Sequence, residues 1–573
     1  MTLKLIISKL SKNNLNDINV IILDGYTNEI LNNHNTQCKI INPPVLDYHE
    51  RYKIYHYLNT LSEKIILELK EHLNILNNVN FDTKDWKIIV GPWLNNFLKI
   101  IYNRYAKIKY VLDNNQISEI SITTCDKICL SGIDNYHLIS LTNNSEWNSI
   151  IYSKVIDFLK PKVKIVTKNL TSDFTRNKNK LFKSKIKKLL FFFTSLFVKQ
   201  DNALIVNSYL PTFEYIKLNL YLRQFPLYWN PITLIKNKYD FELRNKIILK
   251  RSEDKFETFV KKLIPIYLPS CHLESFIDLK KIINNMRLPK TPKFIFTSNS
   301  YEFDELFKLY TVLKKKLKSK YIIGQHGNYL ASLENIFFRD SYSADHYIDW
   351  GKNGLGLGQN GFNLKLVNKN IKNNKKGKIL ILDAPYGTNN KVQNRMDENI
   401  PRENFLHDLL NSIDKRLHKH IVIKLHFTYI ERDKSYISKI RAICPDIKIK
   451  FSNKAIFKLL KQSRCIIHTY DSTGILESMV LNIPTFCFWP NKLNHIQKKY
   501  HKYYNELLNS DILFYEPKHL ATKINKFFDD FDRWWLQNDT IDAVNNFLHQ
   551  FSNKPNKNST KVLAERLKEI SKL

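Results

Sequence analysis

The second half of the chain alternates between short apolar strands and helices, and this alternation restricts the possible folds more than any other feature. Strands are predicted at residues 377–385, 420–426, 465–473 and 484–489, with helices such as 402–417 between them. Strands that alternate with helices at this spacing indicate βαβ units and parallel pairing. We therefore predict an α/β fold with a doubly wound parallel sheet in this half.

The first half alternates too, but its helices are longer. One helix is predicted over residues 52–76 and a second over 85–108, interrupted near Gly91 and Pro92. Short apolar runs predict strands at residues 19–25, 204–208, 293–300, 320–327 and 346–351.

We expect two Rossmann-like domains that face each other across a cleft. The first spans residues 1–365 and carries a helical insertion at about 140–290. The second spans residues 366–545 and begins in a stretch rich in Lys and Asn that is typical of a linker. A final helix at 546–573 is expected to pack back on one of the two domains.

The net charge of +35, from 89 Lys and Arg against 54 Asp and Glu, has two explanations. Either the protein binds an anionic partner, or its Lys, Asn and Ile content reflects an AT-rich genome. The positive residues are spread along the chain and form no recognised module, so no nucleic-acid partner is expected. The seven cysteines are scattered, with one close pair, Cys125 and Cys129, which indicates reduced thiols rather than a metal site.

One apolar segment, residues 189–198 (LLFFFTSLFV), follows the basic stretch 183–188 (KSKIKK). It is shorter than the roughly 18 residues that a membrane span requires. Two interpretations are open: a buried helix or strand with a solvated basic flank, or peripheral contact with an anionic inner membrane. The apolar core of the first residues is too short for a secretory signal, so a cytoplasmic location is expected.

Ligands of open parallel sheets bind beyond the carboxyl ends of the strands, so the loops that follow strands carry the candidate site residues. In the first half, His326 follows a strand and lies between Gly324-Gln325 and Gly327. Glycines permit positive φ and close approach, and histidine is a suitable general base near neutral pH. The alternative is a histidine held in a tight turn. The acceptor-side candidates are Gln325, Ser298 and Glu302, and for Ser298 and Glu302 a helix cap with a solvated first turn is the favoured alternative.

In the second half, Lys424 and His426 lie on the same side of an extended segment and can donate to phosphate oxygens. A helix is predicted to begin near Gly474, and its free N–H groups make an anion site. The alternative for Lys424 and His426 is that they are ordinary polar residues at the end of a strand. The alternative for the helix start is an ordinary helix cap without a ligand. The candidate donor-binding residues are Lys424, His426, Asp471, Ser472, Thr473 and Glu477.

The motifs GQHG, KLH and DST…E, divided between two Rossmann-like domains, resemble those of GT-B transferases. Teichoic-acid CDP-glycerol glycerophosphotransferases carry a His-Gly pair, a His-Pro motif and an Asp-Tyr-Ser-Ser motif. Capsule Kdo transferases share the His-Pro and Ser-Ser/Thr elements and use CMP-activated sugars. A closer resemblance, over most of the chain, is to a bacterial family of surface-carbohydrate transferases named after a locus tag. It rests on segments such as IIGQHGNYLAS, KLHFTYIERD and TYDSTGILESMVLNIPTFCFW.

The resemblance implies roles for individual residues. His326 matches a base or acceptor-site histidine, and His426 matches the histidine that contacts the donor phosphate. Ser472 and Thr473 match the hydroxyl pair at the phosphate-binding helix start. Their acidic neighbours are Asp471 and Glu477.

Two departures from these motifs matter. Phe427 replaces the proline of His-Pro, so His426 must be oriented by packing. Gln325 stands where the glycerophosphotransferases usually have tryptophan, which argues against a glycerol-phosphate acceptor.

We therefore expect a metal-independent glycosyltransferase-like enzyme without a cofactor. It would move a sugar from a CMP-, CDP- or UDP-linked donor to a cell-surface carbohydrate or a lipid-linked glycan. A sugar-nucleotide epimerase of the same fold and a non-catalytic, basic binding or assembly protein are the alternatives.

Overall fold

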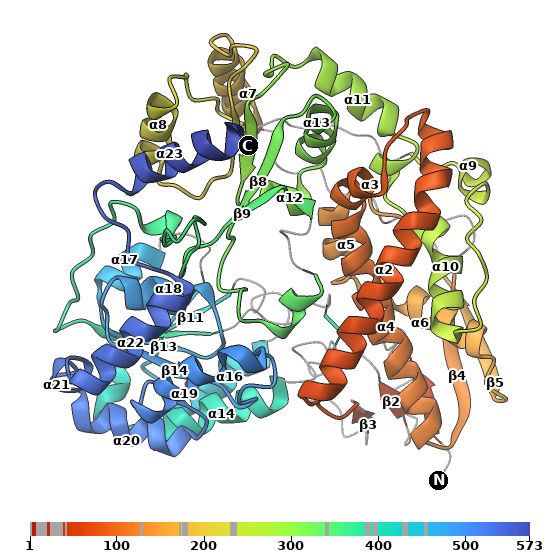
Figure 1. Cartoon of the computed structure of the whole chain (residues 1–573). Coiled ribbons are helices and arrows are strands. Elements are labelled where there is room, and N and C mark those ends of the chain that lie inside the picture. Colours follow the sequence, from red (N-terminus) through yellow and green to blue (C-terminus); the bar gives the residue numbers. More distant parts are fainter. Residues whose placement is uncertain are drawn as a thin grey trace.

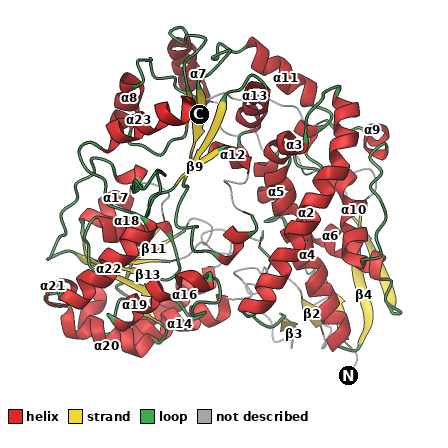
Figure 2. Cartoon of the chain, viewed as in Figure 1, coloured by secondary structure: helices red, strands yellow, loops and turns green. Residues whose placement is uncertain are grey.

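The computed structural model confirms the α/β fold, because the strands that it describes pair in parallel within three sheets. Figures 1 and 2 show these sheets with helices packed around them. The structure describes residues 3–6, 20–22, 38–40, 43–125, 130–170, 174, 182–229, 238–338, 343–383, 391–392, 399–426, 434–451 and 456–572. No helix within these ranges is long and apolar enough to cross a membrane.

The second half of the chain forms the doubly wound sheet that its alternation predicts, in the order β12-β11-β10-β13-β14-β15. The order reverses between β10 and β13, and ligands of such sheets bind in the crevice at this point. The strands are β10 (Lys378–Leu382), β11 (Ile421–Leu425), β12 (Lys448–Phe451), β13 (Ser463–His468), β14 (Thr485–Phe488) and β15 (Leu513–Phe514). The helices are α14 (Asn399–Ser412), α16 (Lys434–Ile443), α17 (Ile456–Lys461), α18 (Thr473–Val480), α19 (His501–Asn509), α20 (Pro517–Phe527), α21 (Asp532–Trp535) and α22 (Asn538–Phe551).

The first part of the chain forms a five-stranded sheet in the order β3-β2-β1-β4-β5. Its two long helices, α2 and α4, pack side by side, and the expected interruption lies between α3 and α4. The strands are β1 (Leu3–Ile6), β2 (Val20–Ile22), β3 (Cys38–Ile40), β4 (Ile117–Thr124) and β5 (Lys164–Asn169). The helices are α2 (Tyr48–Asn77), α3 (Thr83–Ile89), α4 (Gly91–Asn114), α5 (Asn135–Leu141) and α6 (Ser145–Leu159).

A four-stranded sheet lies between these two in the sequence, in the order β6-β7-β8-β9. The strands are β6 (Leu204–Val206), β7 (Phe294–Thr297), β8 (Lys320–Gly324) and β9 (His346–Ile348). The helices of this part are α7 (Phe182–Ser195), α8 (Thr212–Tyr221), α9 (Phe241–Asn245), α10 (Lys255–Tyr267), α11 (Phe276–Asn285), α12 (Ser300–Phe303) and α13 (Glu305–Lys315).

The two faces of the four-stranded sheet belong to different cores, because successive side chains of a strand point to opposite faces. One face joins the core of the first part through Leu204, Ile295 and Ile323. The other face joins the core of the six-stranded sheet through Ile205, Phe296 and Ile322. The sheet therefore connects the two ends of the molecule.

The first half differs from the expectation, because its strands form two sheets rather than one. Region 140–290, expected to be a helical insertion, also contributes β5 and β6. The side chains of β5 are exposed along its whole length, so it lacks the apolar pattern that marks a strand in a sequence. The domain limits at 365 and 545 stay predictions, and the second falls inside α22.

Two surface helices complete the fold. Helix α23 (Ser559–Lys572) packs against α8, where the Thr560 hydroxyl donates to Glu214 at 2.5 Å. Helix α7 lies at the outer edge of the molecule (Figure 1), so the interpretation of 189–198 as a buried segment is wrong. Of its described side chains, Phe191, Thr194 and Ser195 are partly or fully buried, and Phe191 packs against Trp229.

Candidate functional site

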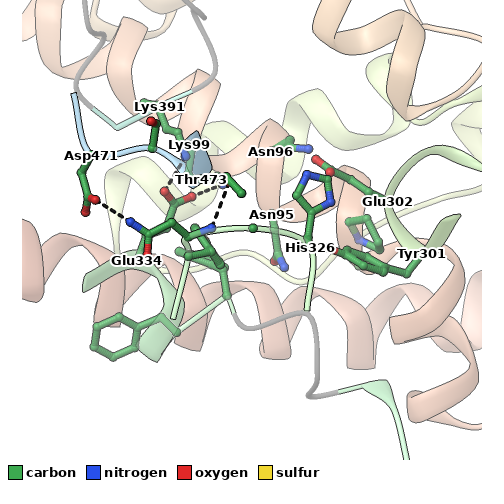
Figure 3. Close-up of a pocket in the computed structure, with 18 of the residues that line it drawn as sticks. Asn95, Asn96, Lys99, Tyr301, Glu302, His326, Glu334, Lys391, Asp471 and Thr473 are labelled. Carbon is green, nitrogen blue, oxygen red and sulfur yellow. Dashed lines mark hydrogen bonds and ion pairs between the residues drawn. The ribbon is translucent and has the colours of Figure 1, made fainter. Parts of the chain in front are cut away.

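A cavity of about 580 Å³ lies between the first half of the chain and the six-stranded sheet. Its lining comes from helices α2 to α4, from the loop after β8, and from the ends of β10, β11 and β13. Figure 3 shows His326 with Tyr301 and Glu302 on one side and Lys391 and Asp471 on the other. The cavity therefore lies at the switch point of the six-stranded sheet, where a doubly wound fold binds its ligands.

His326 lines this cavity, two residues after the end of β8. Its Nδ1 lies 3.1 Å from the hydroxyl oxygen of Tyr209, and the two rings meet edge to face. Burial lowers the pKa of His326 to about 4, and the positive charge of Lys365 contributes to the shift. The imidazole is therefore uncharged at neutral pH. A hydrogen bond to the Ser298 backbone acts on the pKa in the opposite direction. In the tautomer that carries its proton on Nδ1, Nε2 holds the lone pair that can accept a proton.

The two glycines near His326 allow neighbouring side chains to pack closely against this loop. A Cβ at Gly324 would lie 2.6 Å from the Ser298 hydroxyl, and a Cβ at Gly327 would collide with the Thr473 hydroxyl. Neither glycine has positive φ, so that part of the sequence argument is wrong. Glycine is required at Gly327 because the loop touches α18 of the six-stranded sheet region.

This contact joins the two sides of the cavity. The backbone N–H of Asn328 donates to the Thr473 hydroxyl at 3.0 Å, and its side-chain amide donates to Asp471 at 2.6 Å. Asp471 also accepts from the Tyr504 hydroxyl at 3.1 Å and lies 3.4 Å from His495. Asp471, predicted as a donor-binding residue, is therefore held in a network that links the loop after β8 to the six-stranded sheet region, and it lines the cavity.

The start of helix α18 lines the cavity through Ser472, Thr473 and Gly474. Ser472 is the N-cap residue but makes no side-chain capping bond. The first N–H groups of a helix have no partner within the helix, and together with the helix dipole they attract anions. Lys424 lines the same region, and burial lowers the pKa of its ammonium group. Phosphate oxygens would find both a cation and N–H donors here.

Glu477 lies one turn further into α18, and its carboxylate is 3.6 Å from the Lys365 ammonium. Burial raises the pKa of Glu477, while Lys365 acts in the opposite direction. A buried carboxylate that faces a cavity can accept hydrogen bonds from hydroxyl groups of a sugar or ribose.

Asp383 is a cavity residue that the sequence analysis missed. It follows β10 directly, and its carboxylate accepts from Thr469 at 2.6 Å and from Tyr436 at 2.9 Å. The rule that points to Lys424 and Ser472, a polar residue directly after a buried strand, also applies to Asp383.

Glu334, Lys99 and Lys391 form a second group of cavity residues that the sequence analysis missed. The two carboxylate oxygens of Glu334 each lie 2.5 Å from one of the two lysine ammonium groups. Burial raises the pKa of Glu334, but the two lysines outweigh it and hold the pKa at about 2. All three residues line the cavity, so the group leaves one net positive charge there. Lys99 interrupts the apolar face of α4, which is the only sequence signal for it.

Amide side chains from the long helices complete the lining on this side. Ser62 of α2 donates to Asn95 of α4 at 2.8 Å, and the Asn96 amide donates to Asn135 at 3.3 Å. Amide and hydroxyl groups can both donate and accept, so they suit a polyhydroxylated ligand.

The other predicted residues take different places. Glu302 lines the cavity. Gln325 is buried outside its lining, where its amide donates to Gly327 O and accepts from Trp350 N. Ser298 is also buried, and its hydroxyl donates to Ser208 O. His426 is half-buried at the end of β11 and is not among the residues that line the cavity. Phe427 lies outside the described residues.

Among the described residues, Cys271, His272 and Glu305 bring possible metal-ligand atoms within 4.8 Å of one another. All three are buried and lie outside the cavity lining. The Glu305 carboxylate is paired with the Lys308 ammonium at 2.8 Å, so this carboxylate already has a cationic partner.

Three solved glycosyltransferase-related structures show a distant likeness to the chain. The spinosyn rhamnosyltransferase SpnG with spinosyn aglycone is 9% identical, with a TM-score of 0.25, over 52% of this chain and 76% of its own. The wall teichoic acid polymerase TagF is 14% identical, with a TM-score of 0.28, over 52% and 84%. WaaG, a glycosyltransferase of lipopolysaccharide biosynthesis, is 8% identical, with a TM-score of 0.29, over 64% and 99%.

No protein with a curated description matches the chain in sequence. A family model described as LIC12162 family transferase matches residues 3–567, which is nearly the whole chain. The resemblance to a transferase family named after a locus tag is thereby confirmed. The chain belongs to the LIC12162 family of transferases.

Proposed function

We propose that the protein is a glycosyltransferase that moves a sugar from a nucleotide donor to a hydroxyl group of a carbohydrate acceptor. The observation that carries the proposal is the position of an uncharged His326 in the same cavity as Lys424 and the start of α18. A base and an anion site on opposite sides of one cavity are what glycosyl transfer from a nucleotide requires.

The donor phosphate would lie against Ser472, Thr473 and Lys424. As the bond between the anomeric carbon and the phosphate oxygen breaks, its electron pair passes to the leaving nucleotide. The helix N–H groups and the ammonium group stabilise this charge, so the chain's own residues can serve without a metal ion. Asp383 and Glu477 can accept bonds from sugar or ribose hydroxyls.

The acceptor would lie against Glu302 and the amides of α2 and α4. His326 takes the proton of the acceptor hydroxyl while its oxygen forms the new bond to the anomeric carbon. The contacts of Asn328 with Asp471 and Thr473 join the two sides of the cavity, and exclusion of water between them would limit hydrolysis of the donor.

Two measurements test this proposal. CMP, CDP and UDP are titrated in thermal unfolding, and at least one should raise the melting temperature, since native-state binding adds about 2.7 kcal/mol at a hundredfold excess over Kd. Lys424→Met should weaken binding of that nucleotide by about ten- to a hundredfold, the effect of losing a hydrogen bond to a charged group. Lys419→Met, near the start of the same strand, is the control.

The second measurement separates the proposal from an epimerase or a non-catalytic protein. Mass spectrometry follows a nucleotide sugar in the presence and absence of glycan acceptors. Nucleotide release that depends on the acceptor supports transfer. Isomerised donor without release indicates an epimerase, and an unchanged donor across the panel contradicts catalysis.

A further inference from the structure

Helix α7 turns its largest apolar side chains toward solvent. Ile186 is 62% exposed, Phe193 51% and Phe197, just beyond the helix end, 57%. These positions repeat at intervals of seven and four residues and therefore share one helical face. Leu189, Leu190, Phe192 and Leu196 are exposed on the same helix and the turn after it. A helix that exposes more apolar surface than it buries indicates that another molecule or surface covers the exposed face.

The apolar area continues beyond the helix. The Phe197 ring lies 4.6 Å from the ring of Phe225, which is itself 47% exposed. Tyr228 donates its backbone N–H to the Thr194 hydroxyl and is 38% exposed. We define the α7 surface as Ile186, Leu189, Leu190, Phe192, Phe193, Leu196, Phe197 and Phe225.

Basic residues adjoin the α7 surface. The Arg287 guanidinium lies 5.9 Å from the centre of the Phe192 ring. The exposed residues Lys199 and Lys290 are neighbours, because Thr291 N–H donates to Gln200 O across the two segments. The sequence of α7 also contains four lysines and no acidic residue.

These observations distinguish between possible occupants. A second copy of the chain, placed face to face, would bring the cations Arg287, Lys199 and Lys290 near the same group of cations on the other copy, and like charges repel. An acidic peptide would satisfy the cations but leave the aromatic and leucine side chains uncovered. An anionic lipid surface satisfies both, since acyl chains cover the apolar face and headgroups meet the cations. A tyrosine beside the apolar face suits the headgroup level.

We propose that the α7 surface docks the protein on an anionic phospholipid membrane. Helix α7 lies in the plane of the interface and inserts Leu190, Phe193 and Phe197, while Arg287, Lys199 and Lys290 bind lipid headgroups. The chain runs from α7 through β6 to Tyr209, which holds His326. The docking surface and the cavity histidine thus belong to one continuous part of the structure.

The test is flotation of the full chain with vesicles of two compositions, one of phosphatidylcholine alone and one of equal parts phosphatidylcholine and phosphatidylglycerol. The protein should float with the anionic vesicles and stay behind with the neutral ones. The triple variant Leu190→Gln, Phe193→Gln and Phe197→Gln should lower partition into anionic vesicles roughly thirtyfold or more, because three half-exposed side chains lose their apolar contact.

The control replaces three apolar residues that are more exposed on average and lie elsewhere, Leu67→Gln, Ile75→Gln and Ile248→Gln, and it should leave partition unchanged. The pair Arg287→Gln and Lys290→Gln should lower partition into anionic vesicles and make the remaining binding less sensitive to salt. Circular dichroism checks that each variant is folded. Nucleotide binding is measured on each variant as well, because a variant that still binds nucleotide has lost membrane docking with its cavity intact.

Three results would overturn the proposal. The first is equal partition of the α7 triple variant and the control. The second is equal binding of the unaltered protein to neutral and anionic vesicles. The third is a dimer in size-exclusion chromatography that the α7 triple variant abolishes, because that result assigns the α7 surface to contact between copies of the chain.

Discussion

The two sides of the cavity are assembled in different ways. On the six-stranded side, the lining residues Asp383, Lys424 and Ser472 come from strands β10 and β11 and from the loop after β13 of one parallel sheet. On the opposite side, the lining comes mostly from helices, with Ser62 in the middle of α2, Asn95 in the second turn of α4 and Lys99 one turn further, while α12 and the loop after β8 follow strands.

The difference explains what each side can do. Strand ends and a helix start place fixed N–H groups and cations at one point, which suits a compact anion such as a phosphate. Long helices present rows of polar side chains, which suit an extended ligand with many hydroxyl groups. Donor and acceptor roles should therefore separate by side, and substitutions on one side should leave the function of the other intact.

The largest expected effect is on turnover, from His326→Ala. Loss of a general base lowers turnover by roughly 10²- to 10⁴-fold. Nucleotide affinity should change little, because the phosphate contacts lie on the other side. Turnover and nucleotide binding are measured on one preparation, with His346→Ala, in the neighbouring strand β9, as the control. A variant that is less stable but fully active would show that His326 only shapes the turn.

The second effect is on stability, from Glu334→Gln. The change leaves Lys99 buried without its carboxylate partner, and breaking a buried pair in this way costs about 3 kcal/mol. The free energy of unfolding is measured by urea denaturation near neutral pH. Since the pKa of Glu334 is about 2, the unaltered protein should keep this contribution at neutral pH and lose it as the pH falls from the ordinary carboxyl range toward that value.

The control is Glu63→Gln, whose carboxylate pairs with Lys87 at a more exposed place. This substitution should cost less than 1 kcal/mol, about the value of a surface pair. Equal losses in the two variants would contradict a special role for the buried group.

The third effect tests whether the two sides must touch. Gly327→Ala places a methyl group against the Thr473 hydroxyl, and overpacking of this kind costs roughly 1–3 kcal/mol. Both stability and turnover should fall. Thr473→Ala removes the clashing atom, so the double variant should recover stability relative to Gly327→Ala alone, in a double-mutant cycle. Additive losses would mean that the contact does not limit the loop.

The difference between the sides also explains how much the sequence predicted. Strands β10, β11, β13 and β14 of the six-stranded sheet were predicted because buried parallel strands form nearly continuous apolar runs, whereas β15 has only two residues and no such run. Lys424, Ser472, Thr473 and Glu477 were predicted as site residues because strand ends converge at one edge of a sheet, and all four line the cavity.

The opposite side escaped prediction for physical reasons. A polar residue within a helix, such as Asn95 of α4, looks in a sequence like an ordinary surface position, and only tertiary packing turns it toward a cavity. The separation of two sheets in the first half depends on pairing between strands far apart in the chain, such as β1 with β4. Gln325 was predicted to face the acceptor, but its amide is used by Gly327 and Trp350.

The smallest effect concerns the pH dependence of turnover. Burial is the larger cause of the low pKa of His326, about 4, and the charge of Lys365 is the second. A cation nearby disfavours the protonated imidazole, so Lys365→Met should raise the pKa of His326 toward its ordinary value without reaching it. Because the uncharged imidazole is the base, the acid limb of kcat/KM should move to higher pH, and the rate above that limb should not depend on pH.

The profile is measured from about pH 4 to about pH 8, where it reports the groups of the free enzyme. Lys365 also lowers the pKa of Glu477, so the substitution raises the pKa of that carboxyl group as well. Glu477→Gln removes this second titration, and the double variant with Lys365→Met isolates His326. An acid limb that stays in place in the double variant would mean that another group sets the protonation of the base. An acid limb that moves to higher pH would assign that limb to the His326 imidazole on the acceptor side. The Lys365 ammonium group that shifts the imidazole pKa pairs with α18 on the donor side.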